Sequence, residues 1–95
     1  MTDPTVHDNQ SESRFEITID GHTGFLAYHV DSDGRLVLDH TEVPEELGGQ
    51  GVGGKLVRAA VDRAESQGEV LVPVCPFAKS WIDKHPDEAA RVTVG

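Results

Sequence analysis

Residues 46–57 read ELGGQGVGGKLV, and the density of glycine is the most informative feature of this stretch. Five of the seven positions from Gly48 to Gly54 are glycine, and a sequence with helical periodicity follows at once. Glycine loses more conformational entropy on folding than any other residue, so such a cluster is destabilising unless an uncovered backbone is needed. At the start of a helix the usual reason is an anion, because free N–H groups and the helix dipole attract negative charge. The stretch therefore predicts an anion-binding turn.

The sequence before the glycines predicts an antiparallel meander. Residues 14–20 alternate between apolar and polar side chains, as is typical of a half-buried strand. The turn signals DG at 20–21 and DSDG at 31–34 separate this segment from further strands over 23–30 and 35–43.

The sequence after the glycines predicts a strand–helix–strand unit. Residues 51–67 have an apolar stripe at helical spacing, and Gly68 supplies a C-terminal stop. EVLVPV at 69–74 is almost continuously apolar, which indicates a strand covered on both faces. Pro76 then suits the first turn of a short helix. The predicted fold is an α/β mixed sheet: an antiparallel meander, the strand–helix–strand unit and a short C-terminal helix.

Size and charge limit the possible functions. The 95 residues suffice for one small domain, expected over 13–95 after a disordered tail at 1–12. No apolar run is long enough to span a membrane, and the lone cysteine, Cys75, suits a reducing cytoplasm. A formal net charge of −9 argues against non-specific nucleic-acid binding but is compatible with cationic acceptors. The histidines have no metal-ligand spacing, so we expect no metal.

Two nucleotide-binding motifs match the glycine stretch only in part. Residues 49–55 fit G-x-x-x-x-G-K, but Leu56 stands where a serine or threonine would hold magnesium. Gly49, Gly51 and Gly54 fit G-x-G-x-x-G, but that motif needs a buried parallel strand before it and an acid after the next strand. Neither requirement is met by this sequence.

A third interpretation fits the order of the elements. Antiparallel strands, a glycine turn, a long helix, a buried strand and a short helix resemble the GCN5-related N-acetyltransferase (GNAT) superfamily. GGQGVG at 48–53 fits the family pattern Arg/Gln-x-x-Gly-x-Gly/Ala at Gly51 and Gly53, and departs from it at Gly48. HTEVPEELGGQGVGGKLV and VPVCPFAKSWIDKHP are similar to hallmark segments of one compact GNAT-like branch.

The resemblance implies an acetyl-CoA-dependent transferase that acetylates a primary amine. The pyrophosphate would lie on the backbone amides of 50–55, and the pantetheine arm along the strand that ends at Val43. Residues implied to bind acetyl-CoA are Val43, Gly48, Gly49, Gln50, Gly51, Val52, Gly53, Gly54 and Lys55. The acceptor is left open between a small molecule and a protein lysine or N-terminus.

Acyl transfer needs a group that takes a proton from the amine. His40 and Glu42 are candidates because they share one face of a strand; the alternative is a structural pair above the core. Cys75 precedes Pro76 at the start of a helix, a place that favours a thiolate. It could carry the acetyl group, lie beside the thioester, or be a small buried apolar residue. The rival function is a non-catalytic CoA-binding or protein-interaction module.

Overall fold

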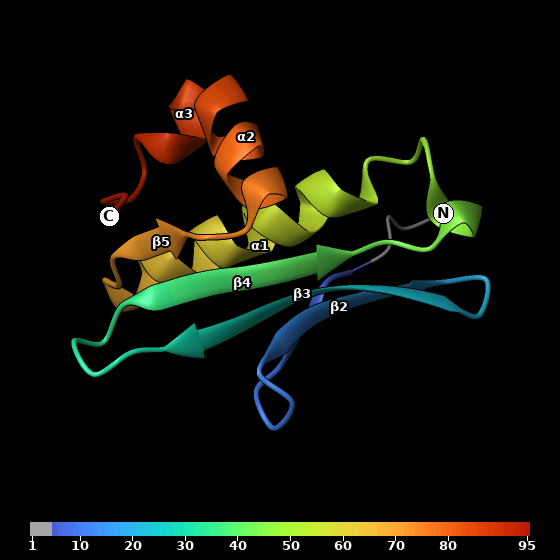
Figure 1. Cartoon of the computed structure of the whole chain (residues 1–95), viewed down its shortest axis with the longest axis horizontal. Coiled ribbons are helices and arrows are strands. Elements are labelled where there is room, and N and C mark those ends of the chain that lie inside the picture. Colours follow the sequence, from blue (N-terminus) through green and yellow to red (C-terminus); the bar gives the residue numbers. More distant parts are fainter. Residues whose placement is uncertain (1–4) are drawn as a thin grey trace.

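The fold is a five-stranded sheet with helices on one side, seen in a computed structural model that describes residues 5–95 (Figure 1). The strands follow chain order across the sheet; β1 to β4 are antiparallel and β5 is parallel to β4. The strands are β1 (His7–Asn9), β2 (Arg14–Ile19), β3 (His22–Val30), β4 (Leu36–Glu42) and β5 (Leu71–Pro73). The helices are η1 (Glu45–Leu47, a 3₁₀ turn), α1 (Val52–Gln67), α2 (Pro76–Lys84) and α3 (Pro86–Ala89). The predicted α/β mixed sheet is confirmed.

The turns and the helix end that were predicted from the sequence are present in the structure. The β2–β3 hairpin turns at Asp20 and Gly21, which both have positive φ, as a type I′ turn requires. At the second turn Asp31 accepts a hydrogen bond from Gly34 N–H. Helix α1 ends at Gly68, which is left-handed and donates its N–H to the carbonyl of Ala64.

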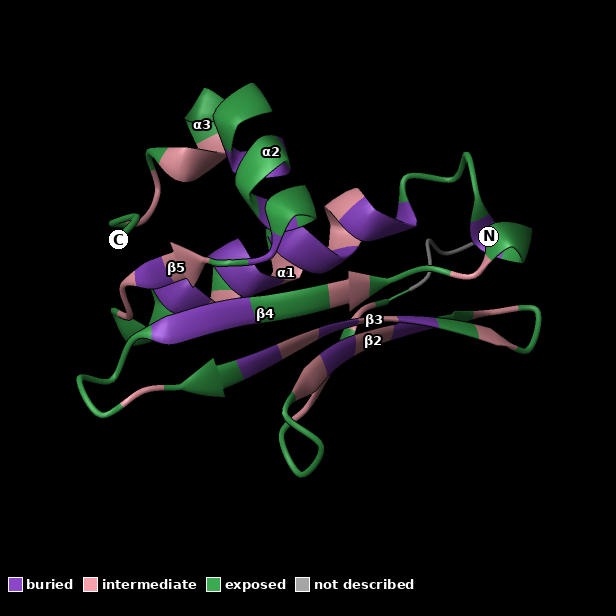
Figure 2. Ribbon diagram, in the orientation of Figure 1, coloured by how far each residue is buried: buried purple, intermediate pink, exposed green. Residues whose placement is uncertain are grey.

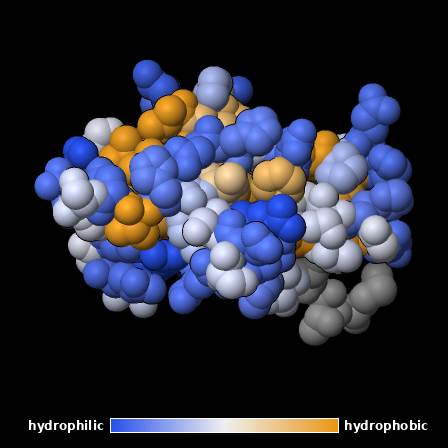
Figure 3. Space-filling view, turned by 60° about the horizontal axis from the view of Figure 1, so that its bottom comes forward, coloured by the Kyte–Doolittle hydropathy of each residue, from blue (hydrophilic) through white to orange (hydrophobic). Residues whose placement is uncertain are grey.

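One face of the sheet carries the core. Buried side chains of β2, β3, β4 and β5 point toward α1 and α2, and Figure 2 shows the buried colour concentrated between these layers. The opposite face of the meander is solvated, apart from the buried Val37. Figure 3 shows hydrophobic side chains in small groups among hydrophilic ones. No helix covers that face within residues 5–95, so any ligand there would meet strand side chains alone.

The expected disordered tail at 1–12 is wrong for part of its length. Residues His7–Asn9 form β1, which pairs with β2, while residues 1–4 lie outside the described part of the chain. A polar cluster fixes this strand: Asp8 accepts hydrogen bonds from the Tyr28 hydroxyl at 2.5 Å and the Arg63 guanidinium at 3.1 Å. Short polar strands carry no apolar signal, and the partner Arg63 is 55 residues away. The pairing was therefore invisible in the sequence.

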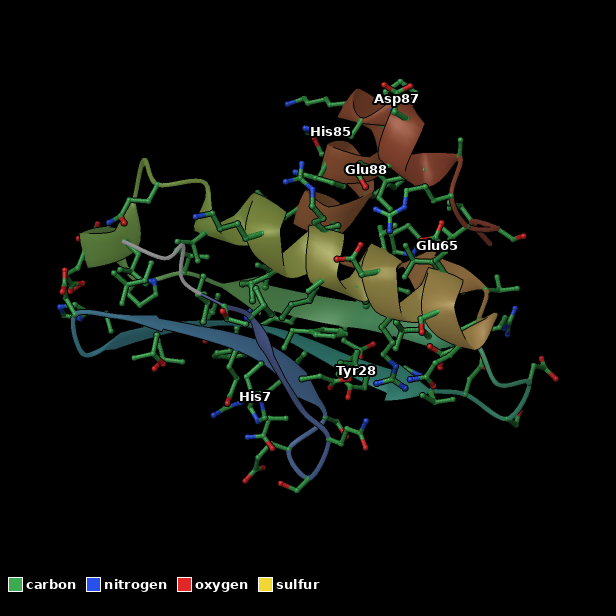
Figure 4. All side chains as sticks on the ribbon, turned by 180° about the vertical axis from the view of Figure 1, so that it is seen from behind. His7, Tyr28, Glu65, His85, Asp87 and Glu88 are labelled. Carbon is green, nitrogen blue, oxygen red and sulfur yellow. The ribbon has the colours of Figure 1, made fainter. Side chains whose placement is uncertain are left out.

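The cluster also assigns Tyr28 a structural role. Tyr28 is 6% exposed and lies below α1, as labelled in Figure 4, with the Arg63 guanidinium 4.8 Å from the ring centroid. Burial, and after it the hydrogen bond to Asp8, raises the pKa of Tyr28 to about 12.

Replacing Asp8 should weaken the polar cluster that holds β1. Asp8→Ala leaves the Tyr28 hydroxyl and one arm of Arg63 without their acceptor, so we expect the free energy of unfolding to fall by about 1–3 kcal/mol. Urea denaturation monitored by circular dichroism measures it. Glu12→Ala, which removes the same charge from an exposed side chain nearby, is the control and should change stability little. Equal effects of the two substitutions would show that the cluster does not stabilise the fold.

Candidate active site

The site begins where β4 and β5 separate. The two strands are in parallel register at only three pairs, from Leu36↔Leu71 to Leu38↔Pro73. The carbonyl of Leu38 then accepts two hydrogen bonds, from Val74 N–H at 3.1 Å and Cys75 N–H at 2.9 Å. Beyond this point the chain of β5 turns into α2, whereas β4 continues to Glu42. Within residues 5–95, this stretch of β4 has a strand partner only on its β3 side.

We call the gap that opens after Leu38 between β4 and the chain that leaves β5 the fork. A β-bulge in β4 decides which of its side chains face this fork. Tyr28 pairs with Leu38 but Ala27 pairs with His40, so Asp39 is an extra residue. Strict alternation from Leu36 and Leu38 would place His40 on the helix side. The bulge reverses the phase and brings Thr41 to that side instead, beside Leu26.

Thr41 meets Cys75 in the fork. The Thr41 Oγ1 and Cys75 Sγ atoms are 3.2 Å apart, and Cys75 is 4% exposed at the N-terminus of α2. Burial acts to raise the pKa of the Cys75 thiol, but hydrogen bonds from the Thr41 side chain and from the backbone of Ala78, Phe77 and Thr41 outweigh it, and the pKa is lowered. The sequence analysis had selected Cys75 and missed Thr41.

The glycine turn leads to a helix start whose first N–H groups make no hydrogen bond within the described chain. Residues 48–51 are exposed, and Gly49 and Gly51 have φ of 77° and 69°. A Cβ built at either position meets nothing within 4 Å. Gly51 offers no capping side chain to α1. Among the described residues, the N–H groups of the helix's first three residues have no hydrogen-bond partner. A free N-terminus of this kind is suited to an anion.

The last two glycines have a packing role that the sequence interpretation did not include. A Cβ at Gly53 would stand 2.6 Å from the Phe77 ring, and a Cβ at Gly54 would stand 2.7 Å from Trp81 Nε1. Because Gly53 and Gly54 have no side chains, α1 and α2 can approach each other closely. Among the amides of residues 50–55, which the resemblance implies for the pyrophosphate, Lys55 N–H already donates to Gly51 O at 3.1 Å.

The other residues predicted to contact the cofactor differ in which of their groups are available to a ligand. Gly48 N–H is already donated to Glu45 O at 2.9 Å, and Val52 has a buried side chain, so it can contribute only its N–H. Gln50 is exposed on the turn, and Val43 is 36% exposed just after β4. Lys55 is half-buried and, among residues 5–95, is in no ion pair.

His40 and Glu42 lie on the other face of the sheet from Cys75. Their Nε2 and Oε1 atoms are 3.9 Å apart, and their side chains are 62% and 65% exposed. The His40 ring meets Phe25 edge-on with centroids 6.3 Å apart. The structure therefore confirms that the pair shares a face, but does not bring it into contact with the thiol; it approaches the fork from the uncovered side.

Two cavities lie away from the thiol itself. The larger, about 310 Å³, is between the end of α1 and the C-terminal segment, where Glu65 and Glu88, labelled in Figure 4, both bind Arg91. The smaller, about 230 Å³, is on the uncovered sheet face and includes Glu42 and Val43. If size alone decided, the larger cavity would be the candidate for a ligand site. Of the two, however, only the smaller adjoins β4, the strand that continues past the fork.

Two general features concern the part of the chain that the structure describes. None of the helices formed by residues 5–95 has the length and apolar character that a membrane span requires. Over the same residues, no group of three or more histidine, cysteine, aspartate or glutamate side chains is arranged to hold a metal ion.

The geometry agrees with comparisons to known proteins. A family model described as GCN5-related N-acetyl-transferase matches residues 14–92. A solution structure of a GCN5-like protein from Staphylococcus aureus, presumed to be an N-acetyltransferase, superposes with a TM-score of 0.72 at 30% identity. The similarity covers 100% of this chain and 93% of the other. No curated protein sequence matches the chain significantly. The fold, the glycine turn and the family match together show that this chain belongs to the GCN5-related N-acetyltransferase family.

Proposed function

We propose that this protein binds acetyl-CoA and transfers the acetyl group to a primary amine. The observation that carries the proposal is the fork: the free edge of β4 lies between the uncapped N-terminus of α1 and the thiol of Cys75. An acyl-CoA has the matching parts in the same order, an anionic diphosphate, an arm with amide groups and a thioester. A cytoplasmic location, where acetyl-CoA is made available to such enzymes, is part of the same proposal.

The diphosphate would be held mainly by backbone. The N–H groups of Val52, Gly53 and Gly54 and the positive end of the α1 dipole favour an anion at this place. Lys55 can add a charge from the first turn. Arg58 is less available, because it pairs with Glu88 at 3.3 Å and lies 5.7 Å from the Trp81 ring centroid.

The arm would then follow β4 as an added strand toward the thiol. Because β4 has no strand on this side after Leu38, its main-chain groups can bond to the amides of the arm. Exposed apolar side chains border this path: Val43 is 36%, Phe77 45% and Val74 61% exposed. They would exclude water from the thioester.

The transfer requires proton removal and stabilisation of the leaving group. An ammonium acceptor loses one proton to His40, with Glu42 beside it. The amine nitrogen then bonds to the acetyl carbon, the C–S bond breaks with its electron pair on sulfur, and the second proton goes to the CoA thiolate. Thr41 and Cys75 would lie beside the sulfur atom of CoA. Cys75 acts either as the neighbour of the thioester or as a nucleophile that carries the acetyl group in a first step.

Two matched glycine substitutions test the diphosphate cradle. Gly51 and Gly68 both have φ of 69°, both are open to solvent, and they lie at opposite ends of α1. Asparagine tolerates this conformation better than most residues, so Gly51→Asn and Gly68→Asn should cost similar stability. Only Gly51→Asn places a side chain in front of the free N–H groups. Titration calorimetry with acetyl-CoA should show affinity weakened about tenfold for it alone.

The calorimetry also decides between the two candidate functions. If the wild-type protein does not bind acetyl-CoA at millimolar concentration, the proposal is wrong. If it binds but a panel of primary amines releases no free CoA thiol, the protein is a binding module instead of an enzyme.

Thr41 and Cys75 can be tested through the reactivity of the thiol. Hydrogen bonds lower the pKa of Cys75, so the rate of alkylation by iodoacetamide should rise at a lower pH than for a thiol with the usual pKa of about 8.5. Thr41→Val removes a donor, raises the pKa and should move the pH–rate curve to higher pH, whereas Thr41→Ser should restore it. Identical curves for all three proteins would mean that Thr41 does not tune the thiol.

The role of Cys75 in turnover needs a separate measurement. Cys75→Ala should lower kcat more than it changes the affinity for acetyl-CoA, because the thiol lies at the thioester end of the path. Intact-mass analysis after incubation with acetyl-CoA shows whether an acetyl group is transferred to the protein. Unchanged kcat in Cys75→Ala would make the residue a packing element only.

A further inference from the structure

The smaller cavity lies next to the fork on the uncovered face of the sheet. Its volume is about 230 Å³, and its lining consists of Thr23, Phe25, Glu42, Val43 and Pro44. Phe25 and Glu42 are cross-strand partners, so an aromatic ring and a carboxylate stand side by side in it. Glu42 directly follows Thr41, the residue that contacts Cys75 from the other face. The cavity therefore adjoins the place where the acetyl group would be presented.

The lining matches an alkylammonium ion. Phe25, Val43 and Pro44 give an apolar wall, and Glu42 is the only ionisable group among the five residues. Among residues 5–95, the one basic group within 4 Å of Glu42 is His40, 3.9 Å away, so the carboxylate has room to pair with a further cation. The Phe25 ring has the Arg14 guanidinium 4.9 Å from its centroid, a cation–π contact within the protein. The net charge of −9 also favours a cationic ligand.

The surrounding backbone favours a small ligand over a peptide. Thr23 and Phe25 belong to β3, which lies between β2 and β4 and pairs with both. Its main-chain groups are used within the sheet, so they cannot bind an extended chain as an exposed edge would. The free edge of β4 is assigned to the pantetheine arm, so recognition of the acceptor comes from the side chains of one cavity, which is smaller than the pockets that enclose drug-sized molecules.

We infer that this cavity is the acceptor site and takes a small free primary amine with a short unbranched alkyl chain. The alkyl chain packs against Phe25, Val43 and Pro44, and the ammonium group pairs with Glu42, from which His40 can take its proton. The inference rests on the proposed function for its meaning, but amine binding to the cavity is independent of turnover.

Binding is tested by NMR on the free protein with n-hexylamine as probe and 1-hexanol as its uncharged control. Hexylamine should shift the backbone amide signals of Thr23, Phe25 and Glu42 saturably, and hexanol should bind at least about tenfold more weakly. Glu42→Gln, an exposed change that keeps the shape, should reduce hexylamine binding to the level of hexanol. The matched control Glu12→Gln should leave it unchanged.

Three results would overturn the inference. They are equal binding of hexanol and hexylamine, shifts that lie outside the cavity, and tighter binding at the same residues by a lysine peptide than by hexylamine. Phe25→Ala adds a second variant whose folded state is visible in the same spectra, and it should weaken hexylamine binding. Should acetyl-CoA bind and turn over while hexylamine leaves these signals unmoved, only the acceptor assignment fails. Should hexylamine bind without any acetyl-CoA binding, it is the proposed transferase activity that fails.

Discussion

The double hydrogen bond at the carbonyl of Leu38 is the constraint on which the site depends. Val74 and Cys75 both donate to this oxygen, which ends the parallel ladder after three residue pairs. Three features of the site are linked to this early end of the β4–β5 pairing. The rest of β4 keeps a free edge, the chain of β5 enters α2 at once, and the thiol of Cys75 is held beside Thr41 where the strands separate. A longer β5 would cover the edge along which we propose that the pantetheine arm binds.

The glycine stretch combines two separate functions in one short segment. Gly49 and Gly51 have left-handed conformations and open surroundings, and so they shape the turn in front of the helix. Gly53 and Gly54 instead lie under Phe77 and Trp81, where any side chain would push α2 away from α1. Since α2 begins just after Cys75, Gly53 and Gly54 also help to fix the position of the thiol. One short segment therefore shapes both the turn before α1 and the contact between α1 and α2.

Much of the fold could be predicted from local patterns, because turns, alternation and helical periodicity are written in neighbouring residues. The hairpin at 20–21 and the helix ending at Gly68 are examples. The missed features depend on distant partners. Strand β1 is held by Arg63, and the bulge at Asp39 depends on how β4 pairs with β3. The sequence analysis selected Cys75 by its residue type and its place at a helix start, and His40 and Glu42 by residue type and their shared strand face. It could not assign them to opposite faces or find Thr41, because one extra residue reversed the alternation.

A crystal structure with bound CoA tests the central claim most directly. The account predicts the diphosphate against the N–H groups of Val52, Gly53 and Gly54, the pantetheine arm along the free edge of β4, and the CoA sulfur beside Thr41 and Cys75. A ligand bound in the larger cavity near Arg91, or one whose sulfur lies away from the fork, would contradict it.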